Sequence, residues 1–138
     1  MTDVGSTPAV SDVIERWEDA LGSHDADRLV ATYAEDAVLE SPLVLHVTGT
    51  QGRLRGHREL RPFFEEIVTR TPTLRGFERG VFFTDGRRVI WEYPRDCPGG
   101  EQMDFVEVME IEDGLIRKHR VYWGWRGVDL IAKDQYYR

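Results

Sequence analysis

The sequence predicts an α+β domain in which a cone-shaped, curved antiparallel sheet packs on about three N-terminal helices and encloses a pocket. Apolar residues recur at helical spacing in the first half of the chain and alternate with polar residues in the second half. The second half also contains two Asp-Gly turn signals, Asp85-Gly86 and Asp113-Gly114. A length of 138 residues suits one domain with a core around a small cavity. We expect residues 1–9 to form a disordered tail and residues 10–138 to form the domain.

The first half contains three helical patterns. The first covers about residues 10–21, with Val13, Ile14, Trp17 and Leu21 on its apolar face. Asp25 can cap the second helix, which we expect over residues 26–34 with Tyr33 facing inward. The third covers residues 57–70, with Phe63, Phe64 and Ile67 facing inward.

Between the second and third helices, residues 37–40 predict a short strand that ends at Ser41-Pro42. Residues 43–56 combine an apolar stretch with a polar, glycine-containing one. We expect them to form a flexible loop that covers the mouth of the pocket.

The second half predicts two hairpins. In the first, strands at 77–84 and 87–93 flank Asp85-Gly86, and Phe83 has the same parity as Val89, Trp91 and Tyr93. The second hairpin, at 103–125, carries an ionisable residue in the middle of each apolar face. These residues are Glu107 on the first strand and His119 on the second.

The turn of the second hairpin decides which residues are opposed. A three-residue loop pairs Ile111 with Leu115 and sets Glu107 against His119, whereas a two-residue Asp-Gly turn pairs Glu107 with Arg120. We prefer the three-residue loop because it opposes apolar residues on one face. Arg117 would share that face and could compete with His119 for Glu107.

Composition excludes several kinds of partner. A net charge of −7 without a dense basic run argues against nucleic acid and against an anionic membrane surface. Cys97 is the only cysteine, so an internal disulfide and a cysteine-based metal cage are excluded. No apolar run reaches the roughly 20 residues of a membrane span, and residues 1–8 lack the features of a secretory signal. We therefore expect a cytoplasmic protein.

Three stretches resemble the nuclear transport factor 2-like superfamily, especially its SnoaL-like and ketosteroid-isomerase-like members. They are residues 33–42 (YAEDAVLESP), 56–64 (GHRELRPFF) and 106–116 (VEVMEIEDGLI). The resemblance implies a single SnoaL-like domain. It leaves the activity open, because the superfamily includes isomerases, polyketide cyclases, dehydratases, epoxide hydrolases and non-catalytic binding domains.

The ketosteroid isomerase pattern is kept only in part. The position of that family's catalytic base carries Ser41, which cannot act as a base alone. The resemblance places Glu107 at the family's protonated-acid position and keeps one supporting tyrosine as Tyr33. Trp17 and Phe64 occupy the positions of two other tyrosines, and Trp123 matches the pocket tryptophan. Steroid isomerisation by the family mechanism is therefore not expected.

His119 is the best replacement for the missing base, because imidazole titrates near neutral pH. Glu107 beside it could hold one tautomer and stabilise the imidazolium, or the pair could only fix the sheet. We expect no metal, because one His and one Glu are too few ligands, and no cofactor. The expected ligand-binding residues are Trp17, Tyr33, Ser41, Phe64, Trp91, Tyr93, Phe105, Val121 and Trp123.

Together these features predict a cofactor-independent enzyme that transfers protons on a small hydrophobic, polyketide-like carbonyl compound. Isomerisation, cyclisation and dehydration remain open. The alternative is a domain of the same fold that binds a hydrophobic or aromatic ligand without chemistry. In either case we expect a homodimer through the outer sheet face, formed by Val106, Val108, Ile116 and Tyr122.

Overall fold

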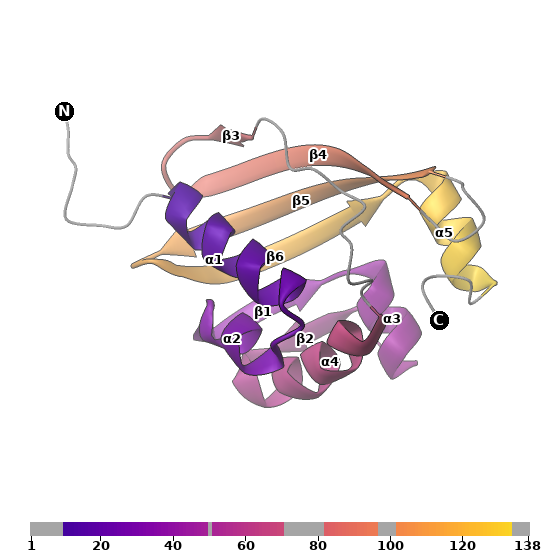
Figure 1. Ribbon diagram of the computed structural model, residues 1–138, viewed down its shortest axis with the longest axis horizontal. Helices are drawn as coiled ribbons and strands as arrows, with labels where there is room; N and C mark the ends of the chain where they lie inside the picture. Colours follow the sequence, from indigo (N-terminus) through magenta and orange to yellow (C-terminus); the bar gives the residue numbers. More distant parts are fainter. Residues whose placement is uncertain (1–9, 50, 71–81, 97–101, 134–138) are drawn as a thin grey trace.

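The computed structural model describes residues 10–49, 51–70, 82–96 and 102–133 of the chain (Figure 1). The expected tail at 1–9 and most of the strand expected at 77–84 lie outside these residues. In order, the elements are α1 (Val10–Gly22), α2 (Ala26–Ala31), β1 (Tyr33–Glu40), α3 (Pro42–Thr48), β2 (Arg53–Arg55), α4 (Gly56–Arg70), β3 (Phe83–Thr84), β4 (Arg88–Asp96), β5 (Gln102–Glu112), β6 (Leu115–Trp123) and α5 (Trp125–Ala132).

The six strands form one open, curved sheet in the order β2-β1-β6-β5-β4-β3. Neighbouring strands run antiparallel except β1 and β6, which run parallel. Figure 1 shows α1 lying across β5 and β6, with α2 and α4 on the same side over β1 and β2. The predicted α+β class and the curved sheet are confirmed, and the core lies between the sheet and these helices.

The three helices predicted in the first half are present. The inner face of α1 is formed by Val13, Ile14, Trp17, Ala20 and Leu21. Asp25 caps α2, because its carboxylate accepts a hydrogen bond from the Arg28 amide at 3.0 Å. This helix ends at Ala31, earlier than expected, because β1 begins at Tyr33.

The prediction of a loop over residues 43–56 is wrong, because this segment contains α3 and β2. The Ser41 hydroxyl accepts a hydrogen bond from the Leu43 amide at 3.1 Å, and Pro42 is the first helical residue. Gly49 closes the helix at a φ of 73° and donates its amide to the Leu45 carbonyl. Ser-Pro, which we interpreted as the end of a strand, is therefore also the start of a helix.

The register predicted for the second hairpin is also wrong. Asp113 and Gly114, both at positive φ, form a two-residue turn in which Glu112 faces Leu115. One extra residue, Arg117, then shifts the register of β6. From Lys118 onward the odd-numbered residues face inward, as expected, although their partners differ from those predicted.

The bulge moves two residues to unexpected faces. Ile116 lies opposite Ile111 and is fully buried, so it does not belong to the outer face to which the sequence assigned it. Arg117 points outward and forms ion pairs with Glu112 at 3.0 Å and with Asp36 of β1 at 3.6 Å. It therefore does not compete with His119 for the carboxylate of Glu107.

Phe83 is a further exception to the predicted alternation. It lies opposite Ile90 on the outer face and is 73% exposed, whereas its parity predicted an inward position with Val89. Thr84 lies opposite Val89, so four residues connect this pair, and an even number of connecting residues sets odd-numbered residues of one strand against even-numbered residues of the other.

Candidate active site

The inner face of the sheet consists of rows of residues that lie side by side on β4, β5 and β6. Each of three successive rows contributes one polar residue to a hydrogen-bonded network. These residues are His119, Glu107 and Tyr93. The rows are Val89, Met109 and His119; Trp91, Glu107 and Val121; and Tyr93, Phe105 and Trp123. The polar side chains therefore interact diagonally across strands, within the reach of long side chains.

Glu107 is the centre of this network. Its Oε1 lies 2.5 Å from Nε2 of His119, and its Oε2 accepts a hydrogen bond from the Tyr93 hydroxyl at 2.6 Å. His119 is 3% exposed and Glu107 is 4% exposed. Both carboxylate oxygens are thus satisfied by short hydrogen bonds, which offset the cost of burying the carboxylate.

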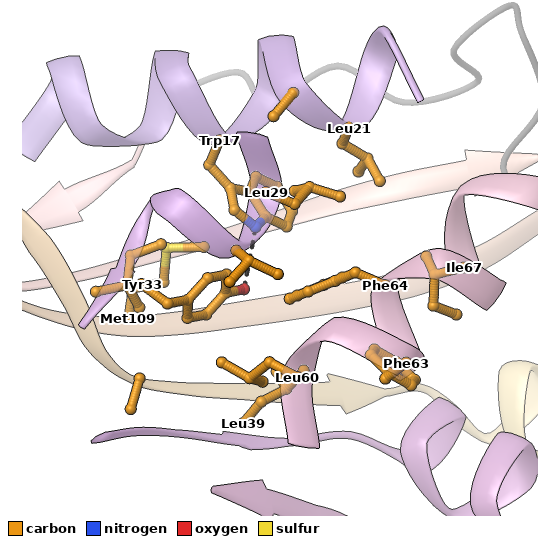
Figure 2. Packing of buried hydrophobic residues seen from close by; sticks show 14 of the residues in the cluster. Trp17, Leu21, Leu29, Tyr33, Leu39, Leu60, Phe63, Phe64, Ile67 and Met109 are labelled. Carbon is orange, nitrogen blue, oxygen red and sulfur yellow. Dashed lines mark hydrogen bonds between the residues drawn. The ribbon is translucent and has the colours of Figure 1, made fainter. Parts of the chain in front are cut away.

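The other ring nitrogen of His119 faces Tyr33. Nδ1 lies 2.7 Å from the Tyr33 hydroxyl. This hydroxyl accepts a hydrogen bond from the Trp17 indole at 3.1 Å (Figure 2). When Nε2–H of His119 donates a hydrogen bond to Glu107, Nδ1 accepts a hydrogen bond from the Tyr33 hydroxyl. Every donor in this series of hydrogen bonds then has one acceptor. The order of donation is then Trp17 to Tyr33 to His119 to Glu107.

Tyr33 is held as a neutral phenol. Burial raises its pKa well above the ordinary value, and the negative charge of Glu107 adds to the rise, while the hydrogen bond from Trp17 opposes it. His57 at the start of α4 approaches the backbone carbonyl of Tyr33 at 2.8 Å and ties β1 to this helix. The hydroxyl is therefore fixed in position and stays protonated near neutral pH.

Aromatic contacts fix the ring planes around the network. Trp17 meets the imidazole of His119 edge-on, with ring centroids 5.6 Å apart. Tyr33 packs against Phe64 of α4 at 5.3 Å, and Phe105 stacks on Trp123 at 4.8 Å. Such pairs contribute about 0.5–1.5 kcal/mol each beyond the area that they bury.

A cavity of about 80 Å³ lies over this network, between the sheet and the helices. His119 and Glu107 line it, as do all but one of the ligand-binding residues expected from the sequence. Those that line it are Trp17, Tyr33, Ser41, Phe64, Tyr93, Phe105, Val121 and Trp123. Aromatic and aliphatic walls with a few convergent polar groups are typical of small-molecule sites.

Trp91 is the exception and does not line the cavity. It is fully buried, meets Trp17 edge-on at 6.3 Å and stacks on Tyr93 at 6.5 Å. As an aromatic residue of inward parity, Trp91 was expected to contact the ligand, but its side chain instead packs against two residues that do form the wall.

Ser41 has a structural role in addition to its place in the wall. Its oxygen accepts the Leu43 amide, which caps α3. The hydroxyl proton remains able to donate to an oxygen in the cavity, because a hydroxyl group is both a donor and an acceptor.

Sequence reasoning missed six lining residues, of which Arg70 at the end of α4 is the polar one. The spacing of Phe63, Ile67 and Arg70 places all three on one helix face, and this signal was available in the sequence. The others are aliphatic or aromatic residues that we expected only as core or loop: Leu21, Leu39, Leu43, Phe63 and Ile67.

No group of three or more His, Cys, Asp or Glu side chains in the described part of the chain is arranged to hold a metal ion. Within the same residues, no helix is both long enough and apolar enough to cross a bilayer.

The fold and the site together define an α+β domain in which a small, largely aromatic cavity lies beside a buried, hydrogen-bonded network of Tyr, His and Glu side chains. The model of the SnoaL-like domain family matches residues 14–119, and the chain belongs to this family. No curated protein is similar enough in sequence to match the chain.

Several solved structures share the fold. A SnoaL-like protein from Burkholderia thailandensis is 23% identical over 83% of this chain and 93% of its own, with a TM-score of 0.66. SalBIII, an epoxide hydrolase/cyclase-like enzyme with a role in pyran ring formation in salinomycin, is 21% identical over 84% and 91%, with a TM-score of 0.65. TerC, which was co-crystallised with polyporic acid, is 18% identical over 88% and 97%, with a TM-score of 0.69. At these identities, the likeness shows the fold alone.

Proposed function

We propose that the protein is a cofactor-independent enzyme that transfers a proton on a small hydrophobic, polyketide-like carbonyl compound. The observation that carries this proposal is the hydrogen-bonded chain from Trp17 through Tyr33 and His119 to Glu107, next to an aromatic cavity. The description of SalBIII as an epoxide hydrolase/cyclase-like enzyme and the co-crystallisation of TerC with polyporic acid support a substrate of this class.

Both ring nitrogens of His119 already have partners, so the imidazole reaches the substrate through Tyr33. In the proposed step, a C–H bond next to a carbonyl breaks and its proton arrives on the Tyr33 oxygen. At the same time, the former Tyr33 proton moves to Nδ1 of His119. The electron pair of the broken bond stays on the substrate as an enolate.

Three features support this relay. Tyr33 remains a neutral phenol throughout the exchange, as its raised pKa requires. The new hydroxyl proton points toward the substrate and can donate to the enolate oxygen. The imidazolium that forms lies 2.5 Å from the carboxylate of Glu107, which stabilises it. Return of the proton to another carbon gives isomerisation, whereas attack by the enolate or loss of a hydroxyl gives cyclisation or dehydration.

Exchange of the benzylic protons of 2-tetralone in heavy water, followed by proton NMR, tests this proposal without knowledge of the natural substrate. The wild-type protein should accelerate exchange above the buffer rate, and His119→Gln should lose about 10²- to 10⁴-fold of that acceleration. Tyr33→Phe should lose a similar factor because it interrupts the relay. Tyr93→Phe removes a hydrogen bond to Glu107 and a hydroxyl from the cavity wall but leaves the relay from Tyr33 to His119 intact, so it should lose less of the acceleration than either of these variants. Undiminished exchange in His119→Gln would contradict the assignment.

A ligand-binding domain without chemistry is the second candidate. One observation favours it: the polar atoms of His119 and Glu107 are all satisfied within the protein, as in a network that only stabilises a wall. It predicts that aromatic ketones quench the fluorescence of Trp17 and Trp123 in a saturable way. After incubation with the protein in heavy water, these ketones should be recovered without deuterium.

We also infer a homodimer through the outer sheet face, in the cytoplasm. Tyr122 is 53% exposed and Ile90 is 42% exposed, and the exposed ring of Phe83 lies beside Ile90. Sedimentation equilibrium should give twice the chain mass for the wild type, and Ile90→Glu combined with Tyr122→Glu should give the chain mass. A wild-type monomer at high protein concentration would exclude this interface.

A further inference from the structure

The last turn of α4 carries a cation at an inward position. Phe63, Ile67 and Arg70 lie on one face of the helix, and all three line the cavity. Phe63 and Ile67 are buried apolar residues, as the core side of a helix requires. Arg70 continues this face with a guanidinium whose charge is permanent, although its side chain is only 12% exposed.

The hydrogen bonds of Arg70 are incomplete. Its Nε donates to Oε2 of Glu66 at 2.9 Å, one helical turn earlier. Its Nη1 is buried and has no hydrogen-bond partner among the described residues. Because a guanidinium presents five N–H donors in a rigid fork, a buried end without an acceptor is suited to an oxygen that comes from a ligand.

We propose that Arg70 binds a carboxylate of the substrate, so that the enzyme acts on an aromatic or polyketide-like carbonyl acid. Among the described residues that line the cavity, Glu107 is the only acidic one, and it lies in the network with His119. A substrate carboxylate is repelled by Glu107 and attracted by Arg70. The acid group therefore lies at the end of α4, and the reacting carbonyl faces Tyr33. Only this orientation rests on the proposed function; the binding of the acid group does not.

A structural role for Arg70 makes a different prediction. The aliphatic stem of an arginine can cover apolar surface while its head reaches water. Arg70→Met keeps most of this stem and removes the charge, so a purely structural role predicts unchanged ligand binding. Arg58, an exposed arginine near the start of the same helix, provides the matched control as Arg58→Met.

The experiment compares aromatic acids with their uncharged amides of the same shape. Benzoate, 2-naphthoate and 4-biphenylcarboxylate, and the three corresponding amides, are titrated into the full chain by isothermal titration calorimetry. At least one acid should bind the wild type and Arg58→Met about 10- to 100-fold more tightly than its amide. In Arg70→Met this preference should disappear, while the amide binds as before. The proposal is overturned if no acid binds the wild type more tightly than its amide, or if Arg70→Met keeps the preference.

His119→Gln separates this proposal from the proposed function. The variant should keep the preference for acids, because Arg70 is intact, even though it loses proton exchange. Exchange activity without any preference for acids would mean that the substrate is neutral. A preference for acids without exchange activity would mean that the pocket binds acids but does not transform them.

Discussion

His119 and Glu107 meet diagonally across two strands. The residue directly opposite His119 on β5 is Met109, and the residue directly opposite Glu107 on β6 is Val121. The imidazole and the carboxylate nevertheless approach to 2.5 Å. The diagonal contact leaves the second carboxylate oxygen facing the next row, where Tyr93 donates to it. Glu107 thus links three rows of the sheet.

Glu107→Gln should destabilise the protein, because the carboxylate accepts hydrogen bonds from two donors. A glutamine amide has one acceptor oxygen, so its NH₂ group would face either His119 or Tyr93. We expect the free energy of unfolding to fall by about 1–3 kcal/mol, measured by urea denaturation at pH 7. Tyr93→Phe should cost less, about 1 kcal/mol. A Glu107→Gln protein as stable as the wild type would show that the network contributes no stability.

Tyr33 should make the protein sensitive to high pH. Its pKa is raised in the folded state, so its contribution to stability is complete below the ordinary tyrosine pKa of about 10. This contribution decreases as the pH rises further, because the unfolded chain releases the proton first. Between about pH 10 and 12, wild-type stability should therefore fall more steeply than that of Tyr33→Phe. Parallel stability curves for the two proteins would contradict the raised pKa.

Asp85 should have the opposite pH dependence. Its carboxylate accepts the Arg88 amide at 2.8 Å and the Arg87 amide at 3.0 Å, and these bonds lower its pKa from 3.8 to about 2. Its contribution to stability is present above pH 3.8 and is lost as the pH falls through about 2. NMR titration of the carboxyl carbon should give the lowered pKa directly. The difference in stability between wild type and Asp85→Ala should shrink over the same range, and a carboxyl that titrates normally would refute this account of the turn.

Ser41→Ala should weaken α3 by removing its N-terminal cap. Loss of such a cap typically costs about 1 kcal/mol, and α3 is a single helix of 7 residues. Ser41→Asn can accept the same amide and should restore most of the loss, as measured by chemical denaturation. If alanine and asparagine have equal effects, the hydrogen bond to Leu43 does not stabilise the helix.

The sequence predicted the contact between Glu107 and His119 even though it predicted the wrong register. The prediction used the alternation of side chains, which places odd-numbered residues of both strands on one face. The two-residue turn alone would have reversed this relation, but the bulge at Arg117 restores it. A bulge has no clear signal in a single sequence, because the extra residue is an ordinary polar one. The alternation was therefore predictable and the exact pairing was not.

Other features required the three-dimensional arrangement. Trp91 has the parity of a wall residue, but it packs against Trp17 and Tyr93 and does not line the cavity. Arg70 follows the inward face of its helix, yet a charged residue at the end of a helix usually points to solvent. Helix α3 is shorter than the segments for which periodicity gives a clear signal, so only its cap could have revealed it.

The bulge at Arg117 also has a consequence for how this pocket can change in evolution. A bulge bends and twists its strand, and here Arg117 sits outside the cavity, tied to Glu112 and to Asp36 on the neighbouring strand. Removing this one exposed residue leaves the wall residues of β6 facing inward but straightens the strand that carries them. The size of the binding space can therefore be adjusted by insertions and deletions at the protein surface, without replacing any side chain that a ligand touches.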